Sequence, residues 1–267
     1  MLENLILYYD CITRKKLLLL KKNIILLPSC VSPIVKKNIS NLIIPDNIKD
    51  LNLNLKNLYK KTPDISNQYL IVISDCSQDY QLSFDDINID SNISNLKIVN
   101  INFSNDEINL IESKGKGYSE VLMIKKTLDQ LGCSGNEIIY KLTARYSLKF
   151  PDSLLRYHSN LMKKNDFAIL YSNIFKRTSC HFFSIKYSFI REIVDEILCK
   201  LNDYNGNILE KVLFDYIKDN DLIRKKRVGR SRIFSYYIRN LQPGSTLARN
   251  NSSSYFYQFL RNICFLL

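Results

Sequence analysis

The sequence predicts one α/β domain, in which a mostly parallel central sheet is flanked by helices. Two observations predict this fold. Short apolar runs recur between helical patterns in the first half of the chain, at residues 23–31, 69–79, 96–103 and 138–140. Such continuous runs are typical of strands that are buried on both faces of a parallel sheet. The second observation is that two of these runs end in polar residues, at the sheet edge where open α/β folds bind their ligands.

Other elements of the first half are expected between these runs. Residues 42–44 suit a short strand, and residues 51–59 suit a helix. The most specific stretch begins at Lys114-Gly115-Lys116-Gly117, a turn whose glycines let backbone N–H groups approach a ligand and whose lysines suit a phosphate. A helix with one apolar face follows this turn.

After Pro151 the pattern changes to α+β without an intervening linker. We expect helices at residues 154–162, 189–201 and 208–217, and short strands at residues 168–171 and 181–185. The C-terminal segment combines the basic run RKKRVGRSR (224–232) with a turn at 242–245 and a final aromatic helix. Residues 1–267 are therefore expected to form a single domain with a helical tail.

The composition indicates partners that carry negative charge. The net charge is +12, from 38 basic and 26 acidic residues, which favours nucleotide phosphates, nucleic acid or an anionic membrane surface. The excess is local, since residues 224–232 are densely basic while residues 75–112 are mildly acidic. The seven cysteines show no metal-ligand spacing, and no signal peptide is evident, so we expect a cytoplasmic protein.

Three pieces resemble, in this order, the nucleotide-sugar half of inverting glycosyltransferases with the GT-A fold. SDCSQD (74–79) is similar to the acidic segment that ends the second strand of that family. KGKGYSE (114–120) stands where a turn of the type N-x-G-x-x-x-A-R-N opens a helix. With YKLTARY (140–146) it is also similar to bacterial surface-polysaccharide glycosyltransferases with the patterns G-K-G-Y-G-E and K-x-T-G-R-Y. Ser119 and Ala144 replace glycines of those patterns.

The resemblance implies a GT-A-like enzyme that moves a sugar from a nucleotide-sugar donor to a growing glycan. The acceptor would be a lipid-linked surface polysaccharide, such as capsule or O-antigen. The chain then divides into a nucleotide-sugar-binding half (1–150), an acceptor and catalytic-base half (151–223) and a basic, aromatic tail (224–267). The implied donor-site residues are Asp75, Ser77, Lys116, Gly117, Glu120, Lys141, Thr143, Arg145 and Arg230.

A metal-binding D-x-D should follow the strand at residues 138–141 in this family, but the chain has Lys141-Leu142-Thr143-Ala144-Arg145 there. A carboxylate pair would hold a divalent cation against the diphosphate, whereas Lys and Arg neutralise phosphates directly. We therefore expect donor binding without a metal or another cofactor. Unpaired cations on a buried strand are costly, so an internal carboxylate is the alternative explanation for Lys141 and Arg145.

Transfer to a hydroxyl group needs a general base, normally an Asp or Glu near the acceptor. The resemblance places this base at or just before a helix, so we expect Glu210, with Asp203 as the second candidate. An ordinary acid at a helix start is the alternative for both. His181 is the candidate acceptor contact, although a lone histidine before a Phe-Phe strand is also typical of a structural residue.

Simpler interpretations also stay open for the donor-site residues. Asp75 suits a loop cap, Glu120 favours the dipole of its helix, and lysines in a turn are commonly solvated.

Two other functions compete with sugar transfer. The charge and the basic run suit a nucleic-acid-binding protein, but no recognised motif accompanies them, so no nucleic-acid partner is expected. A peripheral membrane module with an inactive α/β domain would place the basic and aromatic tail on an anionic membrane. For the transferase as well, we expect a peripheral location on the inner face of the cytoplasmic membrane, reached through this tail.

Overall fold

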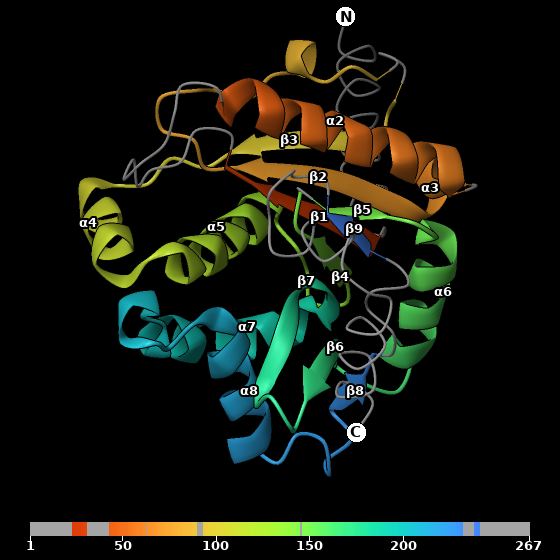
Figure 1. Ribbon diagram of the computed structural model, residues 1–267. Coiled ribbons are helices and arrows are strands. Elements are labelled where there is room, and N and C mark those ends of the chain that lie inside the picture. Colours follow the sequence, from red (N-terminus) through yellow and green to blue (C-terminus); the bar gives the residue numbers. More distant parts are fainter. Residues whose placement is uncertain are drawn as a thin grey trace, which may run out of the picture.

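The computed structural model describes residues 23–30, 43–62, 64–89, 93–144, 146–231 and 238–240. Its central sheet contains β1 (Asn23–Ser29), β2 (Tyr69–Asp75), β3 (Leu96–Asn100), β4 (Ile138–Leu142), β6 (Phe167–Ser172), β7 (Arg177–Lys186) and β8 (Val228–Arg230). The strand order is β3-β2-β1-β4-β7-β6-β8, and a second small sheet pairs β5 (Tyr146–Leu148) with β9 (Ile238–Asn240) (Figure 1). Four pairings of the large sheet are parallel, and β7 runs antiparallel to β4 and β6. The predicted α/β class with a mostly parallel sheet is confirmed.

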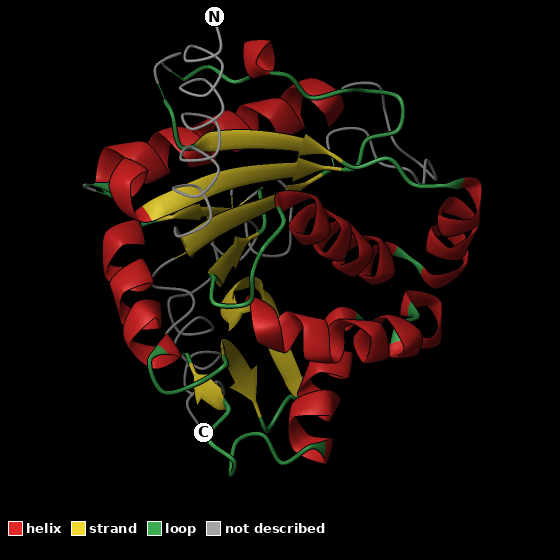
Figure 2. Cartoon of the chain, turned by 180° about the vertical axis from the view of Figure 1, so that it is seen from behind, coloured by secondary structure: helices red, strands yellow, loops and turns green. Residues whose placement is uncertain are grey.

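Helices cover both faces of this sheet (Figure 1; Figure 2). One face packs against α2 (Ile43–Lys61), α3 (Ile65–Gln68) and α6 (Pro151–Met162). The other face packs against α5 (Lys116–Leu131), α7 (Tyr187–Lys200) and α8 (Leu209–Asp219), with α4 (Asn105–Lys114) at the margin. In β1, Ile24 and Leu26 enter one core while Ile25 and Leu27 enter the other. This explains why its sequence is continuously apolar rather than alternating.

The expected strand at residues 42–44 is wrong, because residues 43 and 44 belong to the first turn of α2. This helix buries Leu51, Leu55 and Leu58, which recur at helical spacing and form one apolar stripe against the sheet. The strands expected at 69–79 and 96–103 are also shorter than predicted, since β2 ends at Asp75 and β3 at Asn100. The predicted turn at 242–245 and the final aromatic helix lie outside the described residues.

The expected glycine-lysine turn is a junction between two helices. The sequence reading missed α4, whose N-terminus is a capping box: the Glu107 N–H donates to Ser104 Oγ at 3.3 Å, and Glu107 Oε2 accepts from the Ser104 N–H at 2.7 Å. The spacing S-x-x-E at Ser104 was a signal that could have found this helix. Gly115, with φ 98°, is the single residue between α4 and α5. Its positive φ redirects the chain, so that α5 begins immediately after α4 ends.

The topology brings polar residues to one edge of the sheet. Strands β1 to β4 are mutually parallel, so their carboxyl ends share this edge. Strand β7 is antiparallel to β4, with Lys141 opposite Phe183 and Leu142 opposite Phe182, so the beginning of β7 lies there too. This edge therefore joins residues of the first half of the chain to residues of the second. In the ranges that the structure describes, no helix has the length and apolar character needed to cross a bilayer.

Candidate active site

An ion pair between Glu120 and Lys141 connects the two most specific sequence motifs. Lys141, at the end of β4, is only 1% exposed and yet carries an ammonium group. Its Nζ pairs with the Glu120 carboxylate, donates to Thr143 Oγ1 at 2.8 Å and donates to the carbonyl of Cys180. An ammonium group has three N–H donors, and Thr143 and Cys180 accept from two of them, beside the ion pair with Glu120. The charge of Lys141 is thus balanced inside the protein, as the internal-carboxylate alternative expects.

The glycines before Glu120 allow a second carboxylate to reach the start of α5. Asp203 Oδ2 accepts a hydrogen bond from the Gly117 N–H at 2.8 Å. A Cβ at Gly117 would lie 2.9 Å from Asp203 Oδ1, and a Cβ at Gly115 would lie 2.8 Å from Asp203 Cβ. Both glycines are therefore required by this contact, which also satisfies an N-terminal donor of the helix and complements its dipole. Asp203 is a helix cap contributed by the second half of the chain.

Glu210 lies half-buried in the first turn of α8, next to the same helix start. A Cβ at Gly117 would lie 3.5 Å from the backbone nitrogen of Leu209. The backbone carbonyl of Glu210 accepts a hydrogen bond from Thr178 Oγ1 at 2.9 Å, which anchors α8 to the beginning of β7. The backbone of Glu210 is thus held by β7, and the preceding residue, Leu209, lies close to the start of α5.

Cys180, buried in β7, contacts residues that connect these charged groups: Lys141 donates to its carbonyl, and its thiol lies 3.7 Å from Thr178 Oγ1. Burial raises the pKa of the thiol, the carboxylates of Glu210 and Glu120 raise it further, and the ammonium of Lys141 lowers it. The three charged residues come from α8, α5 and β4, and contacts tie them to neighbouring residues of β7: Lys141, paired with Glu120, reaches Cys180, and the Glu210 carbonyl accepts from Thr178. The pairing of β6 with β7 shifts register between Ile169 and Tyr171, an irregularity of the kind that is common beside active sites. Two carboxylates and one ammonium therefore share one neighbourhood.

The acidic segment after β2 lies beside the same helix. The pKa of the Cys76 thiol is raised by its hydrogen bond with Cys30 and by burial, whereas the hydroxyl of Ser119 in α5 lowers it. Asp75 is buried, and its Oδ2 accepts from the Ser77 N–H at 3.1 Å, which is the geometry of a loop cap. Asp75 and the buried Ser77 are thus placed at the site edge in a preformed turn.

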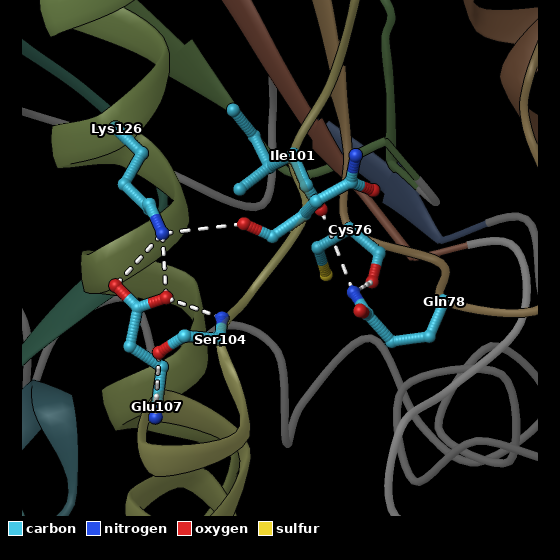
Figure 3. Close-up of polar contacts among 7 residues, drawn as sticks. Cys76, Gln78, Ile101, Ser104, Glu107 and Lys126 are labelled. Atoms are coloured by element: carbon cyan, nitrogen blue, oxygen red, sulfur yellow. Dashed lines mark hydrogen bonds and ion pairs between the residues drawn. The ribbon is translucent and has the colours of Figure 1, made fainter.

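Hydrogen bonds brace this segment against its neighbours (Figure 3). Gln78 Nε2 donates to the carbonyls of Cys76 at 3.0 Å and Ile101 at 3.5 Å. On the other side, Lys126 of α5 donates to the carbonyl of Asn102 at 3.2 Å and pairs with Glu107 of the α4 capping box. The ends of β2 and β3 are thereby tied to α4 and α5.

His181 and Thr143 lie together at the end of β4. The Thr143 N–H donates to the His181 carbonyl at 3.0 Å, and Thr143 Oγ1 accepts from Lys141. The half-buried imidazole of His181 packs edge-on against Tyr146, with ring centroids 4.4 Å apart, and its Nδ1 lies 3.1 Å from Ser179 Oγ. His181 is therefore adjacent to the charged cluster. Lys116 is exposed at the first position of α5.

Arg230 is not brought to this cluster. In the register of the sheet, Arg230 of β8 lies opposite Ile169 of β6, Ile169 lies opposite Phe183 of β7, and Phe183 lies opposite Lys141 of β4. Three strand spacings of about 4.8 Å therefore separate the backbones of Arg230 and Lys141. Its guanidinium lies 5.1 Å from the centre of the Tyr171 ring.

The basic run around Arg230 has internal partners. A Cβ at Gly229 would meet Asn165 Nδ2 at 2.8 Å, so this glycine serves packing within the protein. Arg227 pairs with Asp166 and Glu192, and Arg224 pairs with Asp221. Arg145, the remaining predicted donor contact, lies outside the described residues.

Two contributors to the site were missed in the sequence. Thr178 positions α8 through the Glu210 carbonyl, and Cys180 supplies a carbonyl to Lys141. No local pattern could have found them, because their roles arise from the register of β7 against β4 and from its irregular pairing with β6.

The residues at the D-x-D position do not fit a divalent cation. Lys141 brings an ammonium to this place and engages Glu120, whereas Mg²⁺ and similar ions require oxygen ligands. Among the residues that the structure describes, no group of three or more His, Cys, Asp or Glu side chains is arranged to hold a metal.

Comparisons with known proteins give distant structural similarities. No protein family and no curated protein matches the sequence. Mouse xyloside xylosyltransferase 1 is 6% identical with a TM-score of 0.47, over 79% of this chain and 85% of that one. The galactosyltransferase LgtC, in complex with donor and acceptor sugar analogues, is 9% identical with a TM-score of 0.45, over 78% of this chain and 73% of that one. A putative glucose-1-phosphate thymidylyltransferase from Bacillus anthracis is 9% identical with a TM-score of 0.43, over 86% of this chain and 92% of that one. These similarities are too distant to assign an activity to this chain.

Proposed function

We propose that this protein is a glycosyltransferase with a GT-A-like fold that moves a sugar from a nucleotide-sugar donor to a glycan. The observation that supports the proposal is that the Glu120–Lys141 ion pair and the start of α8 with Glu210 both contact the beginning of β7, at Cys180 and Thr178, at the carboxyl edge of the sheet. Open α/β sheets bind nucleotides at this edge. Glu120 and Lys141 belong to the motifs that resemble glycosyltransferases, and Glu210 comes from the half in which the catalytic base was expected.

Glu210 is the proposed general base. Its carboxylate would take the proton of an acceptor hydroxyl while the hydroxyl oxygen attacks the anomeric carbon of the donor sugar. The bond between that carbon and the phosphate oxygen breaks, and the electron pair leaves with the nucleoside diphosphate. Such a direct displacement inverts the anomeric centre. Asp203 is the weaker candidate, because its carboxylate already caps α5 through Gly117.

Lys141 is proposed as a positioning residue for Glu120. Two of its donors are taken by Thr143 Oγ1 and the Cys180 carbonyl and its charge is paired with Glu120, so a direct contact with the diphosphate would compete with that ion pair. The held carboxylate of Glu120 would instead accept hydrogen bonds from hydroxyl groups of the donor sugar. Lys116, at the start of α5, and Arg145 would then contact the diphosphate.

The remaining roles follow the position of each residue. Asp75 and Ser77 would hold the base or ribose of the nucleotide, because both are buried at the end of β2. Thr143 and His181 would face the acceptor side. We propose metal-independent transfer to a lipid-linked surface polysaccharide, in the cytoplasm at the membrane surface. The support for metal independence is the ammonium group at the D-x-D position.

A panel of nucleotide sugars tests the proposal. Donor binding would be followed by calorimetry and nucleoside diphosphate release by a coupled assay, with and without EDTA. We expect binding of at least one donor, release that persists in EDTA, and loss of release in Glu210→Gln with binding retained. A panel in which no donor binds or is hydrolysed would refute the enzyme, and complete loss of activity in EDTA would refute the metal-free part alone.

An exposed ion pair of α5 provides a comparison for the role of Lys141. The exposed pair of Lys125 with Asp195 also joins α5 to another element but lies away from the site edge. Lys141→Met is expected to weaken donor binding, whereas Lys125→Met should leave it unchanged. Equal effects of the two substitutions would argue against a positioning role for Lys141.

A further inference from the structure

The hairpin between β6 and β7 ends in a tip that combines apolar and basic side chains. Its turn spans residues 173–176, and its consecutive apolar residues Ile174 and Phe175 are 53% and 47% exposed. Lys176 and Arg177 follow directly and are exposed as well. Single exposed apolar residues are ordinary. Two adjacent ones followed by two cations share the combination of apolar and basic side chains found in segments that bind membrane interfaces.

The requirements of the turn do not account for these residue types. Lys176 has φ 48°, in the left-handed region that favours glycine or asparagine. Hairpin tips generally carry Gly, Asn, Asp or Ser, which adopt such conformations or bond to the local backbone. Here the local bond comes from Ser172, whose Oγ accepts from the Phe175 N–H at 3.2 Å. The apolar pair and the lysine therefore occupy positions where turn chemistry would favour other residues.

The hairpin lies at the same edge of the sheet as the candidate active site. Ser172 pairs with Arg177 at its base, and β7 runs from there toward its antiparallel pairing with β4, which ends at Leu142. Thr178, one residue beyond Arg177, donates to the Glu210 carbonyl. A surface that receives this tip would therefore face the edge where Glu210 and Lys141 converge.

We infer that this tip docks the protein on an anionic lipid bilayer. Ile174 and Phe175 would insert among the headgroups, while Lys176 and Arg177 contact the lipid phosphates. The charges are complementary, since the tip contains two cations and the protein carries a net charge of +12. Phe84, another strongly exposed aromatic residue, is followed by Asp85 and Asp86, which the same surface would repel. This docking does not depend on the proposed function, because lipid binding needs no turnover.

Substitution by tryptophan tests the tip directly, because the chain contains no other tryptophan whose fluorescence would interfere. Phe175→Trp places a single reporter at the tip, and Phe84→Trp places one at a control position that is 59% exposed. The probe is vesicles of phosphatidylcholine with phosphatidylglycerol, compared with phosphatidylcholine alone. With the anionic vesicles, the emission of Phe175→Trp should shift to the blue and resist an aqueous quencher, while that of Phe84→Trp should not change. An unshifted Phe175→Trp on vesicle-bound protein would overturn the inference.

Co-sedimentation of the full chain supplies an independent measurement. Ile174→Ser with Phe175→Ser, and separately Lys176→Ser with Arg177→Ser, should each weaken binding to the anionic vesicles by about tenfold. Leu53→Ser with Phe84→Ser removes apolar residues of similar exposure elsewhere and should bind like the unaltered chain. Because exposed side chains contribute little to folding, the thermal unfolding midpoints should be unchanged. No binding of the unaltered chain, or equal binding by all variants, would refute docking through this tip.

Discussion

The Asp203 carboxylate lies against the first turn of α5 and accepts a hydrogen bond from the Gly117 N–H at 2.8 Å. This contact distinguishes the two acidic residues that were candidates for the catalytic base. Asp203 is engaged in closing a helix N-terminus, while Glu210, from the first turn of α8, is fixed through its backbone. The two residues therefore make different predictions when each is replaced.

Asp203→Ala should lower the free energy of unfolding by about 1 kcal/mol, the usual cost of losing a helix cap. Glu210→Gln should leave that free energy within about 0.5 kcal/mol, because the side chain is half-buried and its backbone contacts remain. Urea denaturation of both variants measures the difference. A larger loss in Glu210→Gln than in Asp203→Ala would contradict the conclusion that Asp203, and not Glu210, makes the stabilising side-chain contact.

Gly115→Ala should be more destabilising than Gly132→Ala, although both glycines have positive φ. At Gly132 (φ 66°) a Cβ meets nothing within 4 Å, so the cost is conformational and about 1 kcal/mol. At Gly115 (φ 98°) the same Cβ would lie 2.8 Å from Asp203 Cβ, which adds a steric cost of about 1–3 kcal/mol. Denaturant midpoints of the two variants check this, and equal losses would show that Asp203 moves away freely.

Lys141→Met should destabilise the fold by about 3–5 kcal/mol, because it leaves the Glu120 carboxylate without its buried partner. Lys125→Met removes an exposed partner of Asp195 and should cost at most about 1 kcal/mol. The double variant Lys141→Met with Glu120→Gln should recover part of the loss, since no buried charge then remains unpaired. A double variant that is no more stable than Lys141→Met would indicate that the lysine acts through packing instead.

His158 predicts a loss of stability at mildly acidic pH. It is fully buried between Ser184 Oγ and Ser231 Oγ, each 2.8 Å from a ring nitrogen, and burial lowers its pKa from 6.5 to about 3. The folded protein thus favours the neutral ring, while the unfolded chain takes up a proton below about pH 6.5. The stabilisation is complete above that pH and falls by about 1.4 kcal/mol for each pH unit below it, toward the folded pKa.

The measurement is the free energy of unfolding between about pH 6.5 and pH 5, where this group should account for about 2 kcal/mol. His158→Gln removes the titrating group and should flatten the slope over this interval, even if its absolute stability is lower. Only one other histidine, His181, is present in the chain, so the difference between the two proteins isolates His158. An unchanged slope in His158→Gln would contradict the prediction.

Much of the fold was accessible from local patterns in the chain. The apolar runs of β1, β2 and β4 indicated buried parallel strands, and the periodic residues of α5, α7 and α8 indicated helices. Both patterns report which faces are buried, and burial is what forms these elements. The prediction of a short strand at residues 42–44 was wrong because three apolar residues fit both the strand and the helix period. The longer apolar stripe of α2 places residues 43 and 44 in the helix. The α4 helix was not predicted, although the residues of its capping box, Ser104 and Glu107, can be recognised in the sequence.

The sequence was thus sufficient to place polar residues at the carboxyl edge of a parallel sheet and to select Glu120, Lys141, Asp203 and Glu210 as candidates. It left open which charges neutralise one another. Lys141 meets Glu120 from another element and a carbonyl 39 residues away, and Asp203 meets Gly117 over 86 residues. Strand register and helix packing set these partnerships, because hydrogen bonds and ion pairs depend on distances in space rather than along the chain. The tertiary structure therefore decided that Asp203 caps α5 and that Lys141 is paired with Glu120, while the role of Glu210 as the base is our proposal.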